Sequence, residues 1–192
     1  MAVSDRDKWN RIYRNGARNI PAAARVLADF EHLLPVTGRA LDLACGAGGN
    51  ALLLAQHGLQ TWAWDIADAA LEQLQALVSD NELGIAVQRR DVVRLPPDPA
   101  SFDVIVVSRF LERGLIPAII QALRNNGLIF YQTFITEKAP DCGPRNPDYL
   151  LHANELLVLF KSLHIIYYRE EGTLGDSARG FRNEAMLIAQ KR

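Results

Sequence analysis

The chain has 192 residues, of which 49% are hydrophobic and 22% are charged, and its formal net charge at pH 7 is −1. These values describe a chain long enough to bury a core. They exclude general disorder and a strongly basic surface that attracts nucleic acid or an anionic membrane. No apolar run approaches the ~18–20 residues of a membrane span, and the N-terminus shows no apolar targeting segment. We therefore expect a single cytoplasmic domain over residues 1–192.

The N-terminal residues 1–35 contain two helical patterns. A short first helix carries Trp9 and Tyr13, and the sequence RNGARNIP then interrupts it. Pro21 suits the first turn of a second helix over residues 22–34, where apolar residues recur at helical spacing. We expect this part of the chain to form a helical cap.

Residues 39–134 alternate between short apolar runs and helical patterns. The expected strands are 39–44, 59–65, 85–91, 102–108 and 128–134, and the expected helices are 50–58, 69–81 and 115–126. Strands and helices that alternate at this spacing predict an α/β fold with a mostly parallel sheet.

Residues 135–192 have a different pattern. A loop at 137–149 precedes a helix at 153–162, and two strand-like runs at 162–171 and 182–192 follow. These runs predict an antiparallel pair at the edge of the sheet. The expected fold is a doubly wound α/β domain with a seven-stranded, mostly parallel, Rossmann-like sheet, helices on both faces and an antiparallel last strand.

The strongest local motif is LDLACGAGGN at residues 41–50, between an expected strand and an expected helix. Its glycines let a ligand approach the backbone, and the helix N-terminus offers free N–H groups. The motif lacks the P-loop string, and the Asp42 carboxylate would repel a pyrophosphate but pair with an ammonium group. Asp65, at the end of the next strand, is placed to accept hydrogen bonds from ribose hydroxyls. The structural alternative is a turn followed by a helix-capping aspartate.

Four segments in this order resemble a class I S-adenosylmethionine-dependent methyltransferase: DLACGAGG, WDIA at 64–67, RRDVV at 89–93 and FDVIVVSRFL at 102–111. The resemblance implies that residues 39–134 are the donor-binding core, with S-adenosylmethionine as cofactor and S-adenosylhomocysteine as product. The implied donor contacts are Asp42 on the methionine part, Ala44, Cys45, Gly46 and Gly48 in the turn, Asp65 on the ribose, Ile66, Asp91 and Val92 around the adenine, and Ser108 near the methionine end. Ala44 departs from the glycine that is usual at its position.

Methyl transfer mainly requires that donor and acceptor are aligned, so it needs neither a metal nor a catalytic triad. The two cysteines, Cys45 and Cys142, have no paired spacing, and we expect no metal site. The fourth strand ends in SRFL, which differs from the Asn/Asp-Pro-Pro-Tyr/Phe string of enzymes that methylate bases or glutamine. A small-molecule acceptor is therefore favoured.

Two further segments are similar to the tellurite-resistance methyltransferases: residues 131–160 and WNRIYRNG at 9–16. This resemblance implies an oxyanion of tellurium or selenium as acceptor, bound on the side formed by residues 135–192. It also implies that Trp9 and Tyr13 close the donor site. The alternative is that these two aromatic residues only anchor the N-terminal helix.

An oxyanion acceptor needs fixed cations, and the planar guanidinium of arginine suits it. Arg109, directly after the fourth strand, and Arg145, in GPRNP, are the candidate catalytic residues on the acceptor side. The other candidates for polar contacts are Arg179, Arg182, Tyr149 and Gln132.

Several alternatives stay open. A thiol, a carboxylate or a quinone precursor fits the same scaffold as acceptor, and a module that binds the donor without turnover would keep the same motifs. An oxidoreductase that uses a dinucleotide fits poorly because the GxGxxG spacing is missing, and an RNA methyltransferase should show a basic face. We expect no nucleic-acid or membrane partner, and either a monomer or a homodimer.

Overall fold

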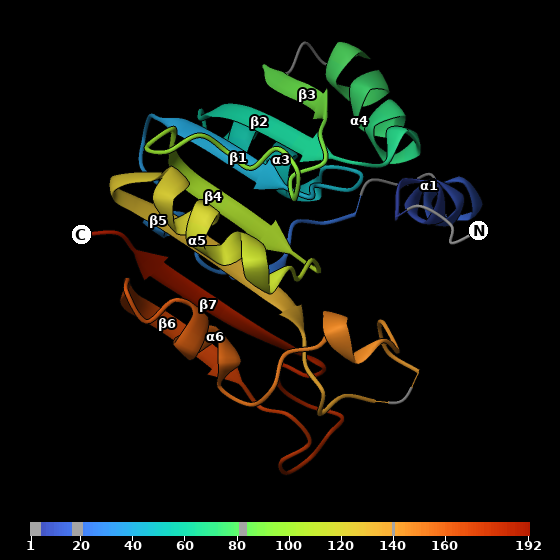
Figure 1. Cartoon of the computed structure of the whole chain (residues 1–192), viewed down its shortest axis with the longest axis vertical. Helices are drawn as coiled ribbons and strands as arrows, with labels where there is room; N and C mark the ends of the chain where they lie inside the picture. Colours follow the sequence, from blue (N-terminus) through green and yellow to red (C-terminus); the bar gives the residue numbers. More distant parts are fainter. Residues whose placement is uncertain (1–4, 17–20, 81–83, 140) are drawn as a thin grey trace.

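The computed structural model describes residues 5–16, 21–80, 84–139 and 141–192. Its centre is a seven-stranded sheet in the order β3-β2-β1-β4-β5-β7-β6 (Figure 1). The strands are Arg39–Leu43 (β1), Gln60–Asp65 (β2), Ile85–Arg89 (β3), Phe102–Ser108 (β4), Leu123–Phe134 (β5), His164–Glu170 (β6) and Glu184–Gln190 (β7). Strands β1 to β5 pair in parallel, and β7 pairs antiparallel with both β5 and β6. The expected fold class is confirmed.

Helices cover both faces of this sheet. They are Asp5–Asn15 (α1), Arg25–Ala28 (α2), Gly49–Gln56 (α3), Asp68–Asp80 (α4), Ile116–Ala122 (α5) and Glu155–Leu159 (α6), with short 3-10 turns at Glu31–Leu33 (η1), Arg113–Leu115 (η2) and Pro147–Tyr149 (η3). Successive side chains of a strand point to opposite faces. In β4, Ile105 and Val107 therefore pack in one core with α5 and α6, and Val104 and Val106 pack in a second core with α2 and α3.

The order of the strands creates a crevice. From β1 the chain winds outward through β2 to β3, and it then returns to place β4 on the other side of β1. In open α/β sheets, ligands bind where the winding direction reverses, beyond the carboxyl ends of the strands. Figure 1 shows α1 beyond this end of the sheet.

The expected helix over 22–34 is wrong in its first part and broken in its second. Residues 21–24 have no regular secondary structure, with an extended backbone at Ala24, α2 is a single turn, and η1 follows. The reason is tertiary: the backbone N–H groups of Ala24 and Val26 donate to side chains of the protein body instead of to a helix. Pro21 therefore begins an irregular segment, here called the strap (residues 21–26), which continues into the first residues of α2.

The expected helix over 115–126 ends early, because β5 begins at Leu123. The carbonyl groups at the end of α5 accept hydrogen bonds from the loop before β4, with Ala100 N donating to Gln121 O and Ser101 N to Ala122 O. These contacts replace the next turn of the helix. The antiparallel pair expected near the C-terminus is confirmed as β6 and β7.

Candidate functional site

The glycine turn between β1 and α3 is tight and partly left-handed. Ala44, Gly46 and Gly48 have φ angles of 55°, 54° and 84°. Cys45 N donates to Trp64 O, and Gly48 N donates to Cys45 O, which fixes the turn against β2. A left-handed conformation costs a residue with a side chain about 1–2 kcal/mol, so Ala44 is held there by its surroundings.

Asp42 is fully buried at the end of β1 and faces the start of α3. Its carboxylate accepts hydrogen bonds from Ala51 N at 3.0 Å and from Asn50 Nδ2 at 3.2 Å. Burial raises the pKa of Asp42 to about 7, although these hydrogen bonds oppose the rise. Asp42 therefore binds the first turn of α3 and supplies a buried acid beside the glycine turn.

Asp65 ends β2 and binds the same turn from the other side. Its carboxylate accepts hydrogen bonds from Gly46 N and from Ala67 N, each at 2.8 Å. Burial raises its pKa, and the backbone donors oppose this shift. The two carboxylates, Asp42 and Asp65, are thus both shielded from water at the floor of the crevice.

The phenol group of Tyr13 lies directly over the glycine turn. A Cβ atom built on Gly46 would stand 2.3 Å from the Tyr13 hydroxyl, so the glycine is needed for this approach. Burial raises the pKa of Tyr13, and the charges of Asp65, Cys45 and Asp42 raise it further. Tyr13 therefore stays a protonated hydrogen-bond donor above the two acids. Burial likewise raises the pKa of the Cys45 thiol.

Polar contacts hold α1 in this position. Asn10 is buried, and its Oδ1 accepts a hydrogen bond from Ala69 N in the first turn of α4 at 2.9 Å. Arg6 binds the Asp68 carboxylate through both Nε and Nη2. The Trp9 and Tyr13 rings lie 6.4 Å apart on this helix. Because none of these residues belongs to a hydrophobic core cluster, α1 docks by capping and charge.

The expected adenine side lies after β2 and β3. Arg90 N donates to Asp65 O, which brings the two strand ends together. Asp91 is half-buried, and its carboxylate accepts hydrogen bonds from Val93 N and Arg94 N. Val92 is buried in the core, and Ile66 is half-exposed.

A cavity of about 520 Å³ opens at the reversal point between β1 and β4. The residues that line it come from the strap, the glycine turn and the start of α3, the ends of β4 and β5, the loop at Cys142, and the segment that leads into β7. Cys45, Ser108 and Arg109, which were expected at the site, are among them. Ser108 Oγ accepts a hydrogen bond from Asn50 Nδ2 at 2.9 Å, which joins the start of α3 to the end of β4.

The structure brings only some of the expected arginines to this cavity. Arg109 lines it and binds Glu184. Arg145 does not line it: its side chain is 88% exposed and lies 3.9 Å from Asp141. Arg182 lines the cavity, but its guanidinium donates to carbonyl oxygens of the loop 171–179 and holds that loop together. Arg179 is exposed.

Sequence reasoning missed two buried residues of the site, Asn50 and Glu184. Asn50 binds Ala24 N of the strap as well as Asp42 and Ser108. Its signal was an amide directly after the glycines, at the start of a helix. The signal of Glu184 in the sequence was only that of an acid at the start of an otherwise apolar strand. The cavity that makes both residues relevant is formed by segments far apart in the chain.

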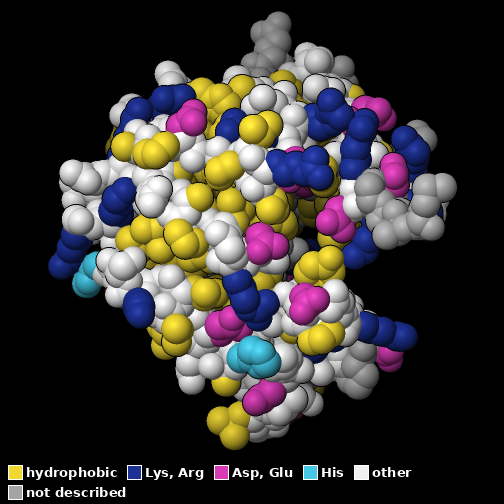
Figure 2. All heavy atoms as spheres, viewed as in Figure 1, with side chains coloured by type: hydrophobic (Ala, Val, Ile, Leu, Met, Phe, Trp, Pro, Cys, Tyr) yellow, Lys and Arg dark blue, Asp and Glu magenta, His cyan; other side chains and the backbone are white. Residues whose placement is uncertain are grey.

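No group of three or more histidine, cysteine or acidic side chains among the described residues is arranged to hold a metal ion. None of the helices in the described ranges has the length and apolar character required to cross a membrane. On the face shown in Figure 2, basic and acidic side chains are interspersed.

Residues 40–127 match the family model of a methyltransferase domain. The match runs from β1 into β5, so it contains the glycine turn and the acids Asp42, Asp65 and Asp91 but neither α1 nor β7. YqeM, a proposed methyltransferase of Bacillus subtilis, is 32% identical over 78 residues, which are 41% of this chain and 31% of that protein. The chain spans well under half the length of the curated relatives it matches.

Solved structures of methyltransferases share the fold. TehB from Haemophilus influenzae superimposes with a TM-score of 0.71 at 22% identity, over 97% of this chain and 67% of that one. An S-adenosylmethionine-dependent methyltransferase of Methanosarcina mazei gives 0.67 at 17% identity, over 89% and 99%. Together with the domain match, these neighbours support S-adenosylmethionine as the cofactor.

The residues of the crevice fit that cofactor. The turn carries no side chain at Gly46, where a Cβ atom would meet the Tyr13 hydroxyl. Two buried carboxylates lie beside it, where one suits an ammonium group and the other suits hydroxyl groups. A ligand with an amino acid end and a ribose meets both requirements.

Proposed function

We propose that the protein is an S-adenosylmethionine-dependent methyltransferase that acts on a small anionic acceptor, with a tellurite- or selenite-type oxyanion as first choice. One observation carries the proposal: Cys45 of the glycine turn and Arg109 line the same cavity at the reversal point. A donor bound at the turn and an anion bound at Arg109 would therefore meet in a single space.

The residues of the chain divide the work as follows. Asp42 would bind the ammonium group of the donor, Asp65 its ribose hydroxyls and Asp91 the amino group of its adenine. S-adenosylmethionine supplies an activated methyl group. An ammonium group beside Asp42 would lower the raised pKa of this acid and keep it ionised. Tyr13 covers the turn and limits the access of water from that side.

Arg109 would hold the acceptor. A guanidinium stays charged at all ordinary pH values and offers paired donors that match two oxygens of an oxyanion or a carboxylate. Ser108 and Asn50 add polar atoms on the same wall of the cavity. Alignment of two bound reactants is the main requirement of this reaction, and fixed groups of this kind meet it. The likeness to TehB, a tellurite-resistance methyltransferase, supports the choice of an oxyanion.

The test is a turnover assay with purified protein, S-adenosylmethionine and sodium selenite or tellurite in the presence of glutathione. We expect release of S-adenosylhomocysteine above the rate without enzyme, and a methylated volatile product in the headspace. An Arg109→Ala variant should lose this turnover and keep its affinity for S-adenosylhomocysteine.

Other results would redirect the proposal. If the protein binds S-adenosylhomocysteine and no oxyanion is methylated, the acceptor assignment fails, and thiols and carboxylates become the next acceptors to test. If no acceptor of any class is methylated, the protein is a donor-binding module. Absence of S-adenosylhomocysteine binding would contradict the methyltransferase proposal as a whole.

A further inference from the structure

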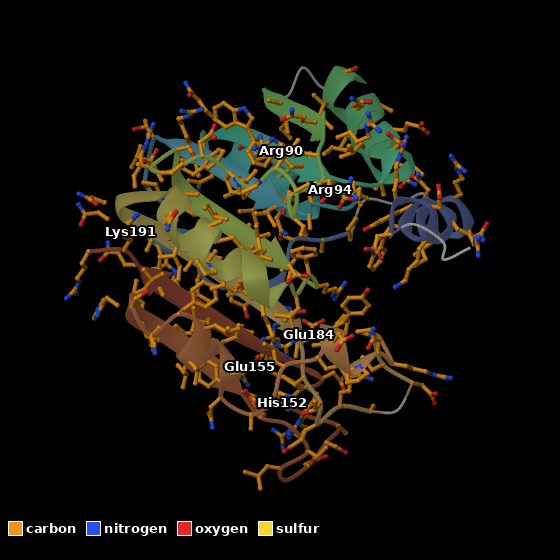
Figure 3. All side chains as sticks on the ribbon, viewed as in Figure 1. Arg90, Arg94, His152, Glu155, Glu184 and Lys191 are labelled. Carbon is orange, nitrogen blue, oxygen red and sulfur yellow. The ribbon has the colours of Figure 1, made fainter. Side chains whose placement is uncertain are left out.

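A chain of hydrogen bonds connects the strap to Arg109 through two buried side chains. Val26 N donates to Gln132 Oε1 at 2.8 Å. Gln132 Nε2 donates to Glu184 Oε2, and Arg109 Nε donates to Glu184 Oε1 at 3.0 Å. Gln132 and Glu184 are only 3% and 7% exposed. Figure 3 labels Glu184 at the start of β7.

This arrangement fixes Arg109 at two points. Its backbone is left-handed, with a φ of 53°, and its N–H donates to Gln132 O at 2.8 Å. Its side chain is held by Glu184 through Nε. Within the described ranges of the chain, the two terminal nitrogens of Arg109 donate no hydrogen bond, and of its side-chain nitrogens only Nε does so. The two terminal nitrogens can act as paired donors to two oxygens of one anion.

A second arginine–glutamate pair shows how a purely structural contact differs. Arg113 binds Glu155 through Nε and Nη2, and it also donates from Nη1 to Asp148 O and from Nη2 to Leu150 O. All three of its nitrogens are engaged, and this pair does not line the cavity. Figure 3 labels Glu155 at α6, a different element from Glu184. Arg109 therefore has two terminal nitrogens that donate no hydrogen bond to the described residues, whereas every side-chain nitrogen of Arg113 does.

We propose that Glu184 and Gln132 are positioning residues, which hold the Arg109 guanidinium toward the cavity so that its terminal nitrogens bind a small oxyanion or carboxylate. Through Gln132, the position of the strap is linked to the position of Arg109. Burial of the Glu184 carboxylate is favourable only with its partners in place, so the contacts with Gln132 and Arg109 each help to fix its position. This inference rests on the proposed function, whose acceptor is an anion.

The inference can be tested without turnover by following the Nε–H resonance of Arg109 in a ¹⁵N-labelled protein, assigned by its loss in Arg109→Lys. Sodium selenite, and sodium sulfate as an anion that cannot be methylated, are titrated into the protein saturated with S-adenosylhomocysteine. We expect a saturable shift in the wild-type protein. Glu184→Gln and Gln132→Met should weaken the apparent affinity for selenite at least tenfold and leave the affinity for S-adenosylhomocysteine unchanged.

The matched control is Glu155→Gln, the same substitution in the other ion pair, which should bind selenite within about twofold of the wild-type protein. Circular dichroism and thermal unfolding identify a variant that does not fold, and Gln132→Met then serves in place of Glu184→Gln. The inference is overturned if the folded variants bind selenite like the wild-type protein, if Glu155→Gln weakens binding equally, or if neither anion shifts the resonance.

The proposed function and this inference fail in different ways. Turnover with selenite but no response of the Arg109 resonance would keep the function and refute the positioning role. A response that depends on Glu184 without any turnover would keep the positioning role and refute the oxyanion as methyl acceptor. In kinetic assays of an active enzyme, the two variants should raise KM for the anion more than they lower kcat.

Discussion

On the donor side of the crevice, the carboxylates of Asp42 and Asp65 bind backbone N–H groups that are no more than 19 residues away in the sequence. On the acceptor side, the contacts are long-range: Arg109 binds Glu184 across 75 residues. Gln132 reaches the strap across 106 residues. The donor side is thus built by one strand–turn–helix unit and its neighbour, and the acceptor side by distant segments that meet only in the folded protein.

Because of this difference, the two sides of the crevice should respond differently to changes in the sequence. A local unit keeps its geometry when the rest of the chain is altered, because its hydrogen bonds lie within the unit. A site assembled from distant segments changes whenever one of these segments shifts. We therefore expect the donor side to tolerate changes in the strap and β7, and the acceptor side to be sensitive to them.

The largest expected effect concerns Asp42. Burial raises its pKa from an ordinary value of 3.8 to about 7, so between about pH 4 and 7 the residue ionises in the unfolded chain but keeps its proton in the folded protein, and the free energy of unfolding falls. The difference corresponds to about 4 kcal/mol at most. Asp42→Asn should flatten the fall in the free energy of unfolding over this range, measured by urea unfolding at several pH values.

The control for this prediction is Asp98→Asn, because Asp98 is exposed and its side chain makes no hydrogen bond or ion pair with other described residues. This variant should follow the pH dependence of the wild-type protein. An unchanged slope in Asp42→Asn would show that Asp42 does not titrate in this range, and it would weaken the contrast between the two sides of the crevice.

The next effect is at the junction of the two sides. A Cβ atom on Gly49 would stand 2.3 Å from Pro21 O and 2.9 Å from Ala22 O, so Gly49→Ala must displace the strap. We expect a loss of about 1–3 kcal/mol in the free energy of unfolding, partly offset by the better helix propensity of alanine. Gly84→Ala, where no atom lies within 4 Å, is the matched control.

The Gly49→Ala variant also tests how the strap affects anion binding. In Gly49→Ala, affinity for selenite should fall more than affinity for S-adenosylhomocysteine, because the strap is linked to Arg109 through Gln132. Equal losses of both affinities would mean that the strap supports the two sides alike.

A smaller effect is expected from α1. Asn10→Ala removes the cap on Ala69 N, which should cost about 1 kcal/mol of stability. It should also weaken S-adenosylhomocysteine binding severalfold, because Tyr13 would no longer be held over the glycine turn. Isothermal titration measures the affinity. Arg11→Ala, on the exposed side of the same helix, should leave it unchanged.

The smallest effect is in the turn itself. Ala44→Gly relieves the cost of a left-handed alanine, about 1 kcal/mol, and adds flexibility to the unfolded chain, so we expect a gain of a few tenths of a kcal/mol up to about 1. The control is Ala100→Gly, because Ala100 also has a left-handed backbone, with a φ of 49°, and lies in an exposed turn. A clear loss in Ala44→Gly alone, measured by thermal unfolding, would show that the Ala44 side chain has a packing role.

The sequence by itself determined the fold class, the parallel strands and the glycine turn with its acids, because local motifs and the alternation of strand and helix patterns indicate these features. The two expected helices that the structure contradicts also have a physical explanation. The helices over 22–34 and 115–126 are cut short because backbone groups in them bind partners elsewhere in the protein.

Only the tertiary structure decided which charged side chains belong to the site. Arg109 and Arg145 have equal standing in the sequence, but the fold brings one into the cavity and leaves the other exposed beside Asp141. Glu184 shows no function in the sequence until β7 is inserted beside β5 and places it between Arg109 and Gln132. The acceptor side depends on such long-range pairing, which no local pattern of residues encodes.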